Sequence, residues 1–179
     1  MEVVKVDGQL EQREGRWQLR FTRTLPHPPE KVWRALTEPE HLAAWFPTDI
    51  EGERAAGAAL RFVFRNGEGP AVDGRMIRYE PPSVLEFRWG NDETLRFDLH
   101  PDGEGTTLTF VNTFDEVGKA ARDAAGWHAW LDLLGHHVAG DQAPWTSSER
   151  WQQVHPSYVE RFGPDASSVG PPASPTGQT

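Results

Sequence analysis

The chain of 179 residues contains no cysteine, so disulfide bonds, thiol nucleophiles and cysteine-based metal sites are excluded. Positive charge is also scarce: 18 Lys and Arg stand against 27 Asp and Glu, which gives a formal net charge of −9. Nucleic acids and anionic membrane surfaces attract basic proteins, so we expect neither as a partner. The simplest interpretation of the acidic surplus is solubility.

Long apolar runs are missing as well, and none approaches the length of a membrane span. The opening residues, MEVVKVDGQLEQ, are too mixed and too charged for a secretory signal, so we expect a cytoplasmic protein. There is no G-x-S-x-G elbow and no Walker loop, and the glycines around Asn66 are too irregular to hold a phosphate. We therefore predict no catalytic residue, no metal site and no cofactor.

Apolar aromatic residues, in contrast, are abundant, with 8 Trp and 9 Phe against 2 Tyr. Such rings fill protein cores and line pockets for flat ligands. The length favours one domain, which we place at residues 1–140, with a helical extension at residues 141–163. Residues 164–179 are rich in Pro, Ser, Gly and Ala without periodicity, and we expect them to be disordered.

Two short helices are predicted between residues 28 and 47. Pro29 and Pro39 each suit the first position of a helix, where the missing N–H of proline costs nothing. Thr37 or Glu38 is placed to cap the second helix. Apolar residues follow each proline at helical spacing, so both helices should pack against a broad apolar surface.

Alternating apolar residues predict an antiparallel sheet that would supply this surface. Residues 16–25 form one strand, and residues 3–12 are expected to pair with it across Glu14-Gly15. Further strands are expected at residues 58–65, 72–79, 84–89, 94–100 and 106–114, with a turn at Asn66-Gly67. Arg23 falls on the apolar side of its strand. We expect it to reach solvent at the strand end; the alternative is a partly buried cation with a carboxylate partner.

The apolar period changes to 3.6 between Gly118 and Gly140, which predicts a long helix that packs on the sheet. The residues Thr146 to Glu149 are typical of a capping box that opens a further helix. His155-Pro156 should break or kink this helix, and Gly163 should end it.

Several motifs carry a family resemblance. They are PPEKVW at residues 28–33 with Leu36, Trp45-Phe46, Gly74 with Pro81-Pro82, LEFRW at residues 85–89, GTTLT at residues 105–109, and Gly126-Trp127 with Leu131 and Leu134. Together they resemble the START-like (SRPBCC) superfamily over residues 16–140. They are similar in particular to the bacterial branch named for the C-terminal domain of the activator of Hsp90 ATPase.

The resemblance implies an α+β helix-grip fold, in which a curved antiparallel sheet surrounds a long C-terminal helix. In the superfamily, a cavity between sheet and helix holds lipids, hormones, polyketides or other apolar molecules. Some members are cyclases or dehydratases, some are binding proteins, and some protect antibiotic producers by sequestration or self-sacrifice. Fold analogy alone does not choose among these functions.

The candidate pocket lining follows from strand parity and helix position. It comprises Trp45, Phe62, Phe64, Phe87, Trp89, Phe97, Phe110, Trp127, Trp130 and Leu131. The alternative is a solid core in which these side chains only pack against one another. Trp145 and Trp151 are expected to pack the extension onto the domain, and the alternative role for them is a lid over one mouth of the cavity.

Asn112 lies on the apolar parity of its strand, where a buried amide must find hydrogen bonds. It would either orient a ligand or satisfy a structural partner. His128, Asp132 and His136 form one column on the long helix. We expect a solvated polar edge there, and the alternatives are metal ligands or an acid–base pair. His137 is also expected to be exposed.

The first functional hypothesis is non-catalytic binding of a small hydrophobic or aromatic molecule, oriented by Asn112 and His128. The second is a cyclase or dehydratase that uses His128 or a carboxylate for proton transfer on a polyketide-like substrate. The third is a protein-interaction module, as in chaperone regulation, that docks through its acidic surface or its C-terminal segment. Self-sacrifice at a glycine such as Gly105 or Gly118 is a variant of the first. The oligomeric state and the identity of the ligand are not determined by the sequence.

Overall fold

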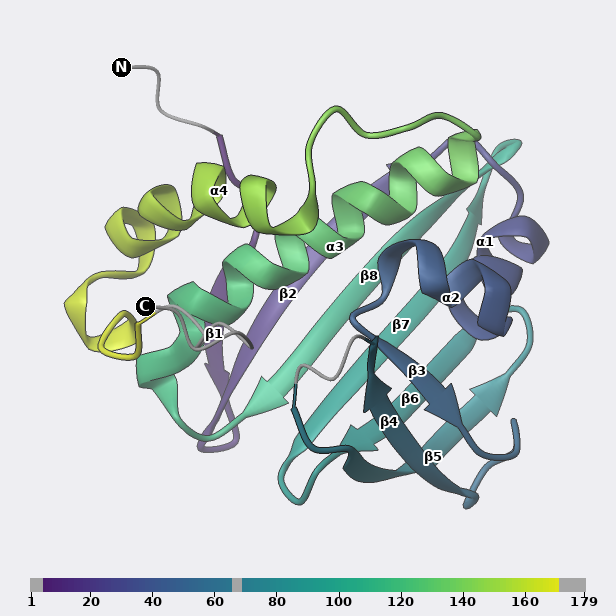
Figure 1. Ribbon diagram of the computed structural model, residues 1–179, viewed down its shortest axis with the longest axis horizontal. Coiled ribbons are helices and arrows are strands. Elements are labelled where there is room, and N and C mark those ends of the chain that lie inside the picture. Colours follow the sequence, from purple (N-terminus) through teal and green to yellow (C-terminus); the bar gives the residue numbers. More distant parts are fainter. Residues whose placement is uncertain (1–4, 66–68, 171–179) are drawn as a thin grey trace.

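The computed structural model describes residues 5–65 and 69–170. Eight strands form one antiparallel sheet in the order β1-β2-β8-β7-β6-β5-β4-β3 (Figure 1). The strands are β1 (Gln9–Arg13), β2 (Arg16–Leu25), β3 (Thr48–Glu51), β4 (Ala59–Phe64), β5 (Val72–Glu80), β6 (Val84–Trp89), β7 (Glu93–Asp102) and β8 (Gly105–Phe114). The helices are α1 (Pro29–Thr37), α2 (Pro39–Trp45), α3 (Ala120–Ala139) and α4 (Ser147–Phe162), with the 3-10 turns η2 (Val117–Lys119) and η3 (Pro164–Ala166).

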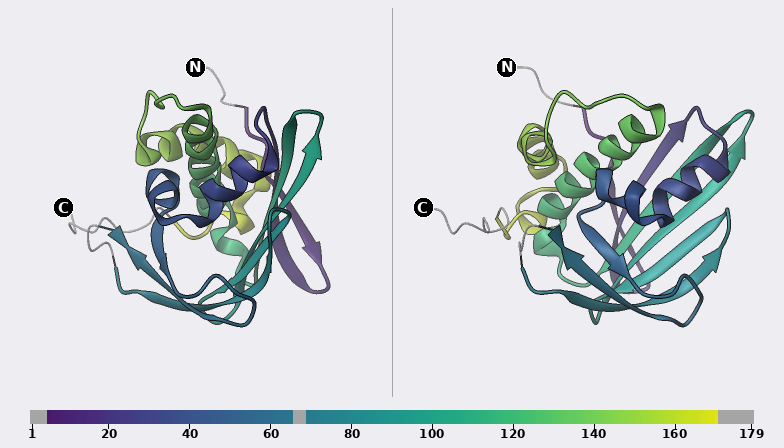
Figure 2. Two further views of the ribbon diagram at one scale, coloured as in Figure 1. Left: turned by 90° about the vertical axis from the view of Figure 1, so that its right-hand side faces the viewer. Right: turned by 45° about the vertical axis from the view of Figure 1, so that its right-hand side comes forward.

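The sheet curves around the long helix α3, as the two views of Figure 2 show. Alternation produces this arrangement: along β8, every second residue is buried from one end of the strand to the other. The buried faces meet α3 to form a single core. The predicted helix-grip architecture is thereby confirmed. Strand β3 was not expected from the sequence, and the predicted turn at Asn66-Gly67 lies outside the described residues.

The short helices begin at their prolines, as predicted. Glu38 occupies the N-cap position of α2, but its side chain makes no capping hydrogen bond. The two helices are held together by the indole of Trp45, whose Nε1–H donates to the carbonyl oxygen of Ala35 at 2.8 Å. Among the described residues, no helix combines the length and the apolar character needed to cross a membrane.

Helix α4 packs along the outer side of α3 (Figure 1). It opens with the predicted capping box, in which Thr146 and Glu149 exchange hydrogen bonds, and Gly163 ends it with φ of 87°. Pro156 lies inside the helix, which continues to Phe162. The predicted break does not occur there, and Val154 and Tyr158, on either side of the proline, are both fully buried against the core.

The segment after Gly163 departs from the expectation of disorder. Residues 164–166 form η3, and Ala166 is buried in the core cluster. The N–H of Val169 donates to the carbonyl oxygen of Gly118 at 3.0 Å. The burial of Ala166 and this backbone hydrogen bond hold the stretch against the domain, although its composition shows no periodicity. Residues 171–179 lie outside the described part of the chain.

Candidate functional site

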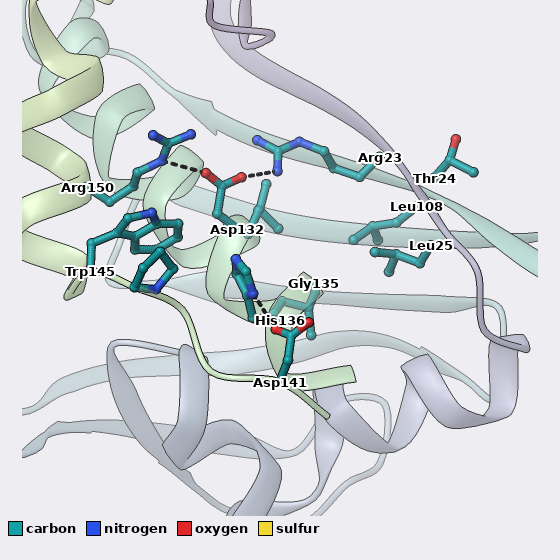
Figure 3. A pocket seen from close by; sticks show the side chains of 13 residues that line it. Arg23, Thr24, Leu25, Leu108, Asp132, Gly135, His136, Asp141, Trp145 and Arg150 are labelled. Carbon is teal, nitrogen blue, oxygen red and sulfur yellow. Dashed lines mark hydrogen bonds and ion pairs between the residues drawn. The ribbon is translucent and has the colours of Figure 1, made fainter. Parts of the chain in front are cut away.

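A pocket of about 590 Å³ opens where α3 faces β2 and β8. Its base is apolar, formed by Leu25 and Leu108 from the sheet and Leu131 and Leu134 from α3. Trp145, from the loop between α3 and α4, lies across the pocket from Leu25 and Leu108 (Figure 3). The volume is within the range of small-molecule sites in proteins.

Gly135 helps to open this pocket. A Cβ built at this helical position would first meet the Cδ2 of Leu25, at 4.0 Å. Position 135 therefore borders open space, because a Cβ there would make no contact closer than this ordinary van der Waals distance. Position 135 lay outside the predicted apolar stripe, and no other feature of the sequence pointed to it.

Charged side chains form the rim (Figure 3). The carboxylate of Asp132 accepts hydrogen bonds from Nη1 of Arg23 at 2.6 Å and from Nε of Arg150 at 2.8 Å. Burial alone would raise the pKa of Asp132, but the hydrogen bond from His128 and the charge of Arg23 hold it well below its usual range. Asp132 therefore stays ionised.

Arg23 does not reach solvent, contrary to the favoured expectation. Its side chain is 17% exposed and also pairs with Asp7, at 2.6 Å. The alternative prediction, a partly buried cation with a carboxylate partner, is the correct one. Its partners are Asp7 in the N-terminal segment and Asp132 in α3. Strand parity predicts which face a residue lies on, but not which distant carboxylates reach it.

The polar column on α3 is not a solvated edge, which corrects another expectation. His128 is 4% exposed, and its Nδ1 lies 2.8 Å from the hydroxyl oxygen of Tyr158. The same hydroxyl accepts the N–H of Gly8 at 3.0 Å. Helix α4 covers this side of α3, and burial raises the pKa of the Tyr158 hydroxyl. His137 is half-buried, with Nε2 2.8 Å from Nδ1 of His41.

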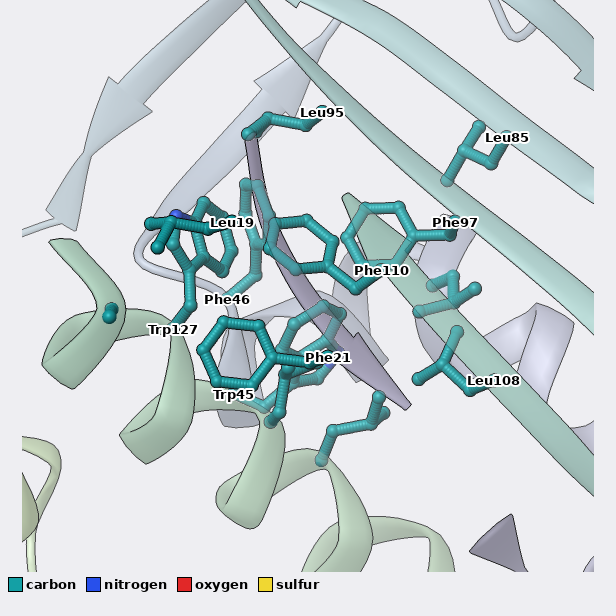
Figure 4. Close-up of a cluster of buried hydrophobic side chains, with 14 of the residues drawn as sticks. Leu19, Phe21, Trp45, Phe46, Leu85, Leu95, Phe97, Leu108, Phe110 and Trp127 are labelled. Atoms are coloured by element: carbon teal, nitrogen blue, oxygen red, sulfur yellow. The ribbon is translucent and has the colours of Figure 1, made fainter. Parts of the chain in front are cut away.

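Part of the predicted aromatic lining lies together in the core, where Figure 4 shows Trp45, Phe97, Phe110 and Trp127. Trp45, Phe62, Phe87, Phe97, Phe110, Trp127 and Leu131 are buried, whereas Phe64, Trp89 and Trp130 are half-buried. The rings are in mutual contact: the centroids of Phe110 and Trp127 are 4.5 Å apart, and those of Phe97 and Phe110 are 4.8 Å apart. Of this set, Leu131 lines the pocket beside α3. A ligand-binding role for the rings stays a prediction.

Asn112 is 1% exposed, and its side-chain amide links β8 to a neighbouring strand. Its Nδ2 donates to the Oε1 of Glu93 at 3.2 Å and to the carbonyl oxygen of Thr94 at 3.3 Å, both on the neighbouring strand β7. Glu93 also forms an ion pair with Lys119, which links this network to the start of α3. The Oδ1 of Asn112 has no hydrogen bond within the described residues. The contacts on Nδ2 favour the structural role, and a ligand contact stays a prediction.

Comparison with known proteins identifies the family. A sequence profile described as "Activator of Hsp90 ATPase homolog 1-like protein" (AHSA1) matches residues 26–139, which is more than half of the chain. The chain belongs to the AHSA1 family. No curated protein matches it.

Solved structures show that AHSA1-like chains share this fold. CalU16 from Micromonospora echinospora superposes with a TM-score of 0.70 at 22% identity, covering 86% of this chain and 96% of its own. EF2215 from Enterococcus faecalis, a conserved protein of unknown function, gives 0.72 at 23% identity, covering 87% and 90%. DynU16, a protein in the dynemicin biosynthetic locus, gives 0.61 at 27% identity, covering 68% of this chain and 47% of DynU16.

The AHSA1 match ends at residue 139, but some residues that line the pocket lie beyond it in the sequence. Trp145 and Arg150 complete its wall from beyond the family region. Trp151 packs the extension onto α3, because its Nε1–H donates to the carbonyl oxygen of Arg122 at 2.9 Å. Within residues 5–65 and 69–170, no group of three or more His, Asp or Glu side chains is arranged to hold a metal ion.

Proposed function

We propose that this AHSA1-family protein binds a small, largely apolar molecule between α3 and the sheet, without transforming it. The observation that supports this most directly is the pocket of about 590 Å³ with a base of four leucines. Burying the apolar surface of a guest contributes about 25 cal/mol per Å². Trp145 offers a flat face, which suits a guest with an aromatic ring.

The state of Asp132 and His128 favours binding over catalysis by these two residues. A general acid or base works best with a pKa near the operating pH. Asp132 is held ionised by Arg23 and Arg150, so it accepts a proton poorly. His128 is buried behind Tyr158 and does not line the pocket. The cyclase or dehydratase hypothesis therefore gains no support from these groups.

The test exploits Gly135. Replacing Gly135 with Leu places a side chain into the open space of the pocket, whereas Gly135→Ala adds a single methyl group. We expect 2-naphthol, used as a flat apolar probe, to shift the methyl NMR signals of Leu25 and Leu131 in the wild type. Gly135→Leu should bind it at least about tenfold more weakly, because about 1.4 kcal/mol of lost contact corresponds to that factor.

Gly135→Ala is the matched control, since it shares the gain in helix propensity, about 1 kcal/mol, and leaves most of the pocket open. It should retain probe binding. Equal binding by the wild type and Gly135→Leu, or probe shifts confined to the interior rings such as Phe110, would contradict the assignment to this pocket.

Sequestration of a natural product is a second candidate, suggested by the likeness to DynU16, a protein in the dynemicin biosynthetic locus, at 27% identity over 47% of DynU16. Gly105 and Gly118, the glycines considered for sacrifice, do not line the pocket. A Cβ at either would meet another atom within 3 Å, so both lie in closely packed positions. Intact-mass analysis after incubation with dynemicin distinguishes the two forms of this hypothesis: sequestration leaves the chain intact, whereas self-sacrifice cleaves it.

A further inference from the structure

A second pocket, of about 510 Å³, lies between the α1–α2 corner and the strands β3 and β5. Figure 1 shows these elements on the opposite side of the molecule from α4. It shares no lining residue with the pocket beside α3. Three of its residues differ in character from the leucine base of the first pocket: Arg54, Trp33 and Tyr79.

Arg54 is half-buried, and its hydrogen bonds go to backbone carbonyls. Nε donates to Thr37 O at 3.2 Å, and Nη1 donates to Ile50 O at 3.2 Å and to Gly52 O at 3.1 Å. The two N–H groups of Nη2 have no hydrogen-bond partner among the described residues. These contacts fix the guanidinium in place and leave one edge of it available.

Arg54 also has no acidic counter-ion within the described residues. Two arginines of the adjacent strand β4 region differ in this respect: Arg61 pairs with Glu51, and Arg65 pairs with Asp49. Burial lowers the pKa of Arg54, because no carboxylate offsets the cost of desolvating its charge. An anion bound in this pocket would supply the negative charge that Arg54 lacks and would offset the cost of its desolvation.

The wall beside this cation is aromatic. The ring centroids of Trp33 and Tyr79 lie 5.5 Å apart at an interplanar angle of 55°. Glu38 also borders the pocket, but its side chain is 42% exposed, and its Oε1 lies 3.7 Å from Nε2 of His41 and forms no ion pair with Arg54. A guest with one negative charge and one flat apolar face fits these surroundings.

We propose that this second pocket is a binding site for a small aromatic carboxylate. The carboxylate accepts hydrogen bonds from Nη2 of Arg54, and the ring lies against Trp33 and Tyr79. Arginine suits this role because its planar guanidinium matches carboxylate geometry. The site is separate from the one in the proposed function, and it differs in the charge of its guest.

The experiment is an NMR titration of the full-length protein with benzoate, followed at the side-chain Nε–H of Arg54 and the indole N–H of Trp33. Both signals should shift in a saturable manner. Benzamide, which has the same shape without the charge, should bind at least about fivefold more weakly, and added salt should weaken the binding of benzoate alone. Absence of saturable shifts with benzoate, or equal binding of benzamide, would overturn the proposal.

Variants assign the charge to Arg54. Arg54→Gln should weaken benzoate binding about tenfold or more, since a charge-assisted hydrogen bond is lost. Arg75→Gln is the matched control, because Arg75 also donates to a backbone carbonyl, that of Gly57, but lies outside the pocket. It should bind benzoate as the wild type does.

Because Arg54 also supports the turn after β3, Arg54→Lys is included to retain the positive charge. Arg54→Lys should keep part of the affinity for benzoate, because its side chain is still positively charged.

Glu38→Gln, which removes the one carboxylate on the wall, should strengthen benzoate binding. Weaker binding in Glu38→Gln would contradict the proposal. Gly135→Leu should leave benzoate binding unchanged, so the outcome here does not depend on the function assigned to the pocket beside α3.

Discussion

Asp132 connects three parts of the chain through a single carboxylate. It forms ion pairs with Arg23 of β2 and Arg150 of α4, and its Oδ2 lies 3.4 Å from Nε2 of His128 on its own helix. The side chain is only 16% exposed, so the ions are largely removed from water. Such a network is stable only while every charge keeps a partner.

Replacing Asp132 with Asn keeps the side-chain volume and removes the charge that both arginines face. We expect a loss of about 2–4 kcal/mol in the free energy of unfolding at pH 7, measured by urea denaturation. Glu80→Gln, which breaks an exposed ion pair with Arg78, should cost about 1 kcal/mol or less.

The same carboxylate makes stability depend on pH. The pKa of Asp132 is lowered in the folded protein, so the unfolded chain takes up the proton first as the pH falls below about 4. The stabilisation is present above this pH and is lost on acidification. The stability difference between wild type and Asp132→Asn should therefore shrink between pH 5 and pH 3; a constant difference would show that this charge does not contribute.

Helix α4 shows how local and tertiary signals combine in one element. Its start is fixed by the capping box of Thr146 and Glu149, which satisfies N–H groups that the first turn leaves unpaired. Its interior contains Pro156, which opposes a helix. Burial of Val154 and Tyr158 on either side of the proline outweighs that opposition.

Thr146→Ala should lower the free energy of unfolding by about 1 kcal/mol, because the side-chain oxygen that accepts the N–H of Glu149 is lost. Ser148→Ala, an exposed change in the first turn of the same helix, should alter it by about 0.5 kcal/mol or less. Thermal unfolding of both variants measures the difference. Equal effects would mean that the cap is not what stabilises this end of α4.

At the scale of the whole molecule, the chain beyond the family region completes the domain. Tyr158 is fully buried against Phe21 and accepts the N–H of Gly8, so α4 joins the two ends of the described chain. Ala166 and Val169 then close the start of α3. Val154, Tyr158 and Ala166 therefore make the segment after α3 a contributor to the core rather than an appendage.

A chain ending at Gly140 should fail to fold stably, because it exposes the buried face of α3 and leaves His128 without its partner. A chain ending at residue 170 should unfold at the same temperature as the full-length protein. Circular dichroism melts of both truncations test this. A cooperative, native-like melt for the shorter chain would show that α4 is dispensable.

The sequence by itself determined the order of the elements apart from β3, and the family resemblance of its motifs implied the helix-grip architecture. Alternation and 3.6-residue periodicity depend on neighbours along the chain, and these signals are strong in β2, β8 and α3. The same signals marked the aromatic residues that form the core and the burial of Asn112, whereas the capping box of α4 was marked by its own local motif, Thr146 followed three residues later by Glu149.

The tertiary structure alone decided where space remains and which charges are paired. The burial of His128 and Arg23 depends on α4 and on the N-terminal segment, which lie far away in sequence. The open space at Gly135 depends on how α3 packs against Leu25. The charge of Arg54 is uncompensated because, among the described residues, the fold brings no carboxylate into an ion pair with it. Patterns along a chain set the faces of its elements, whereas cavities and ion pairs arise only from how those faces meet.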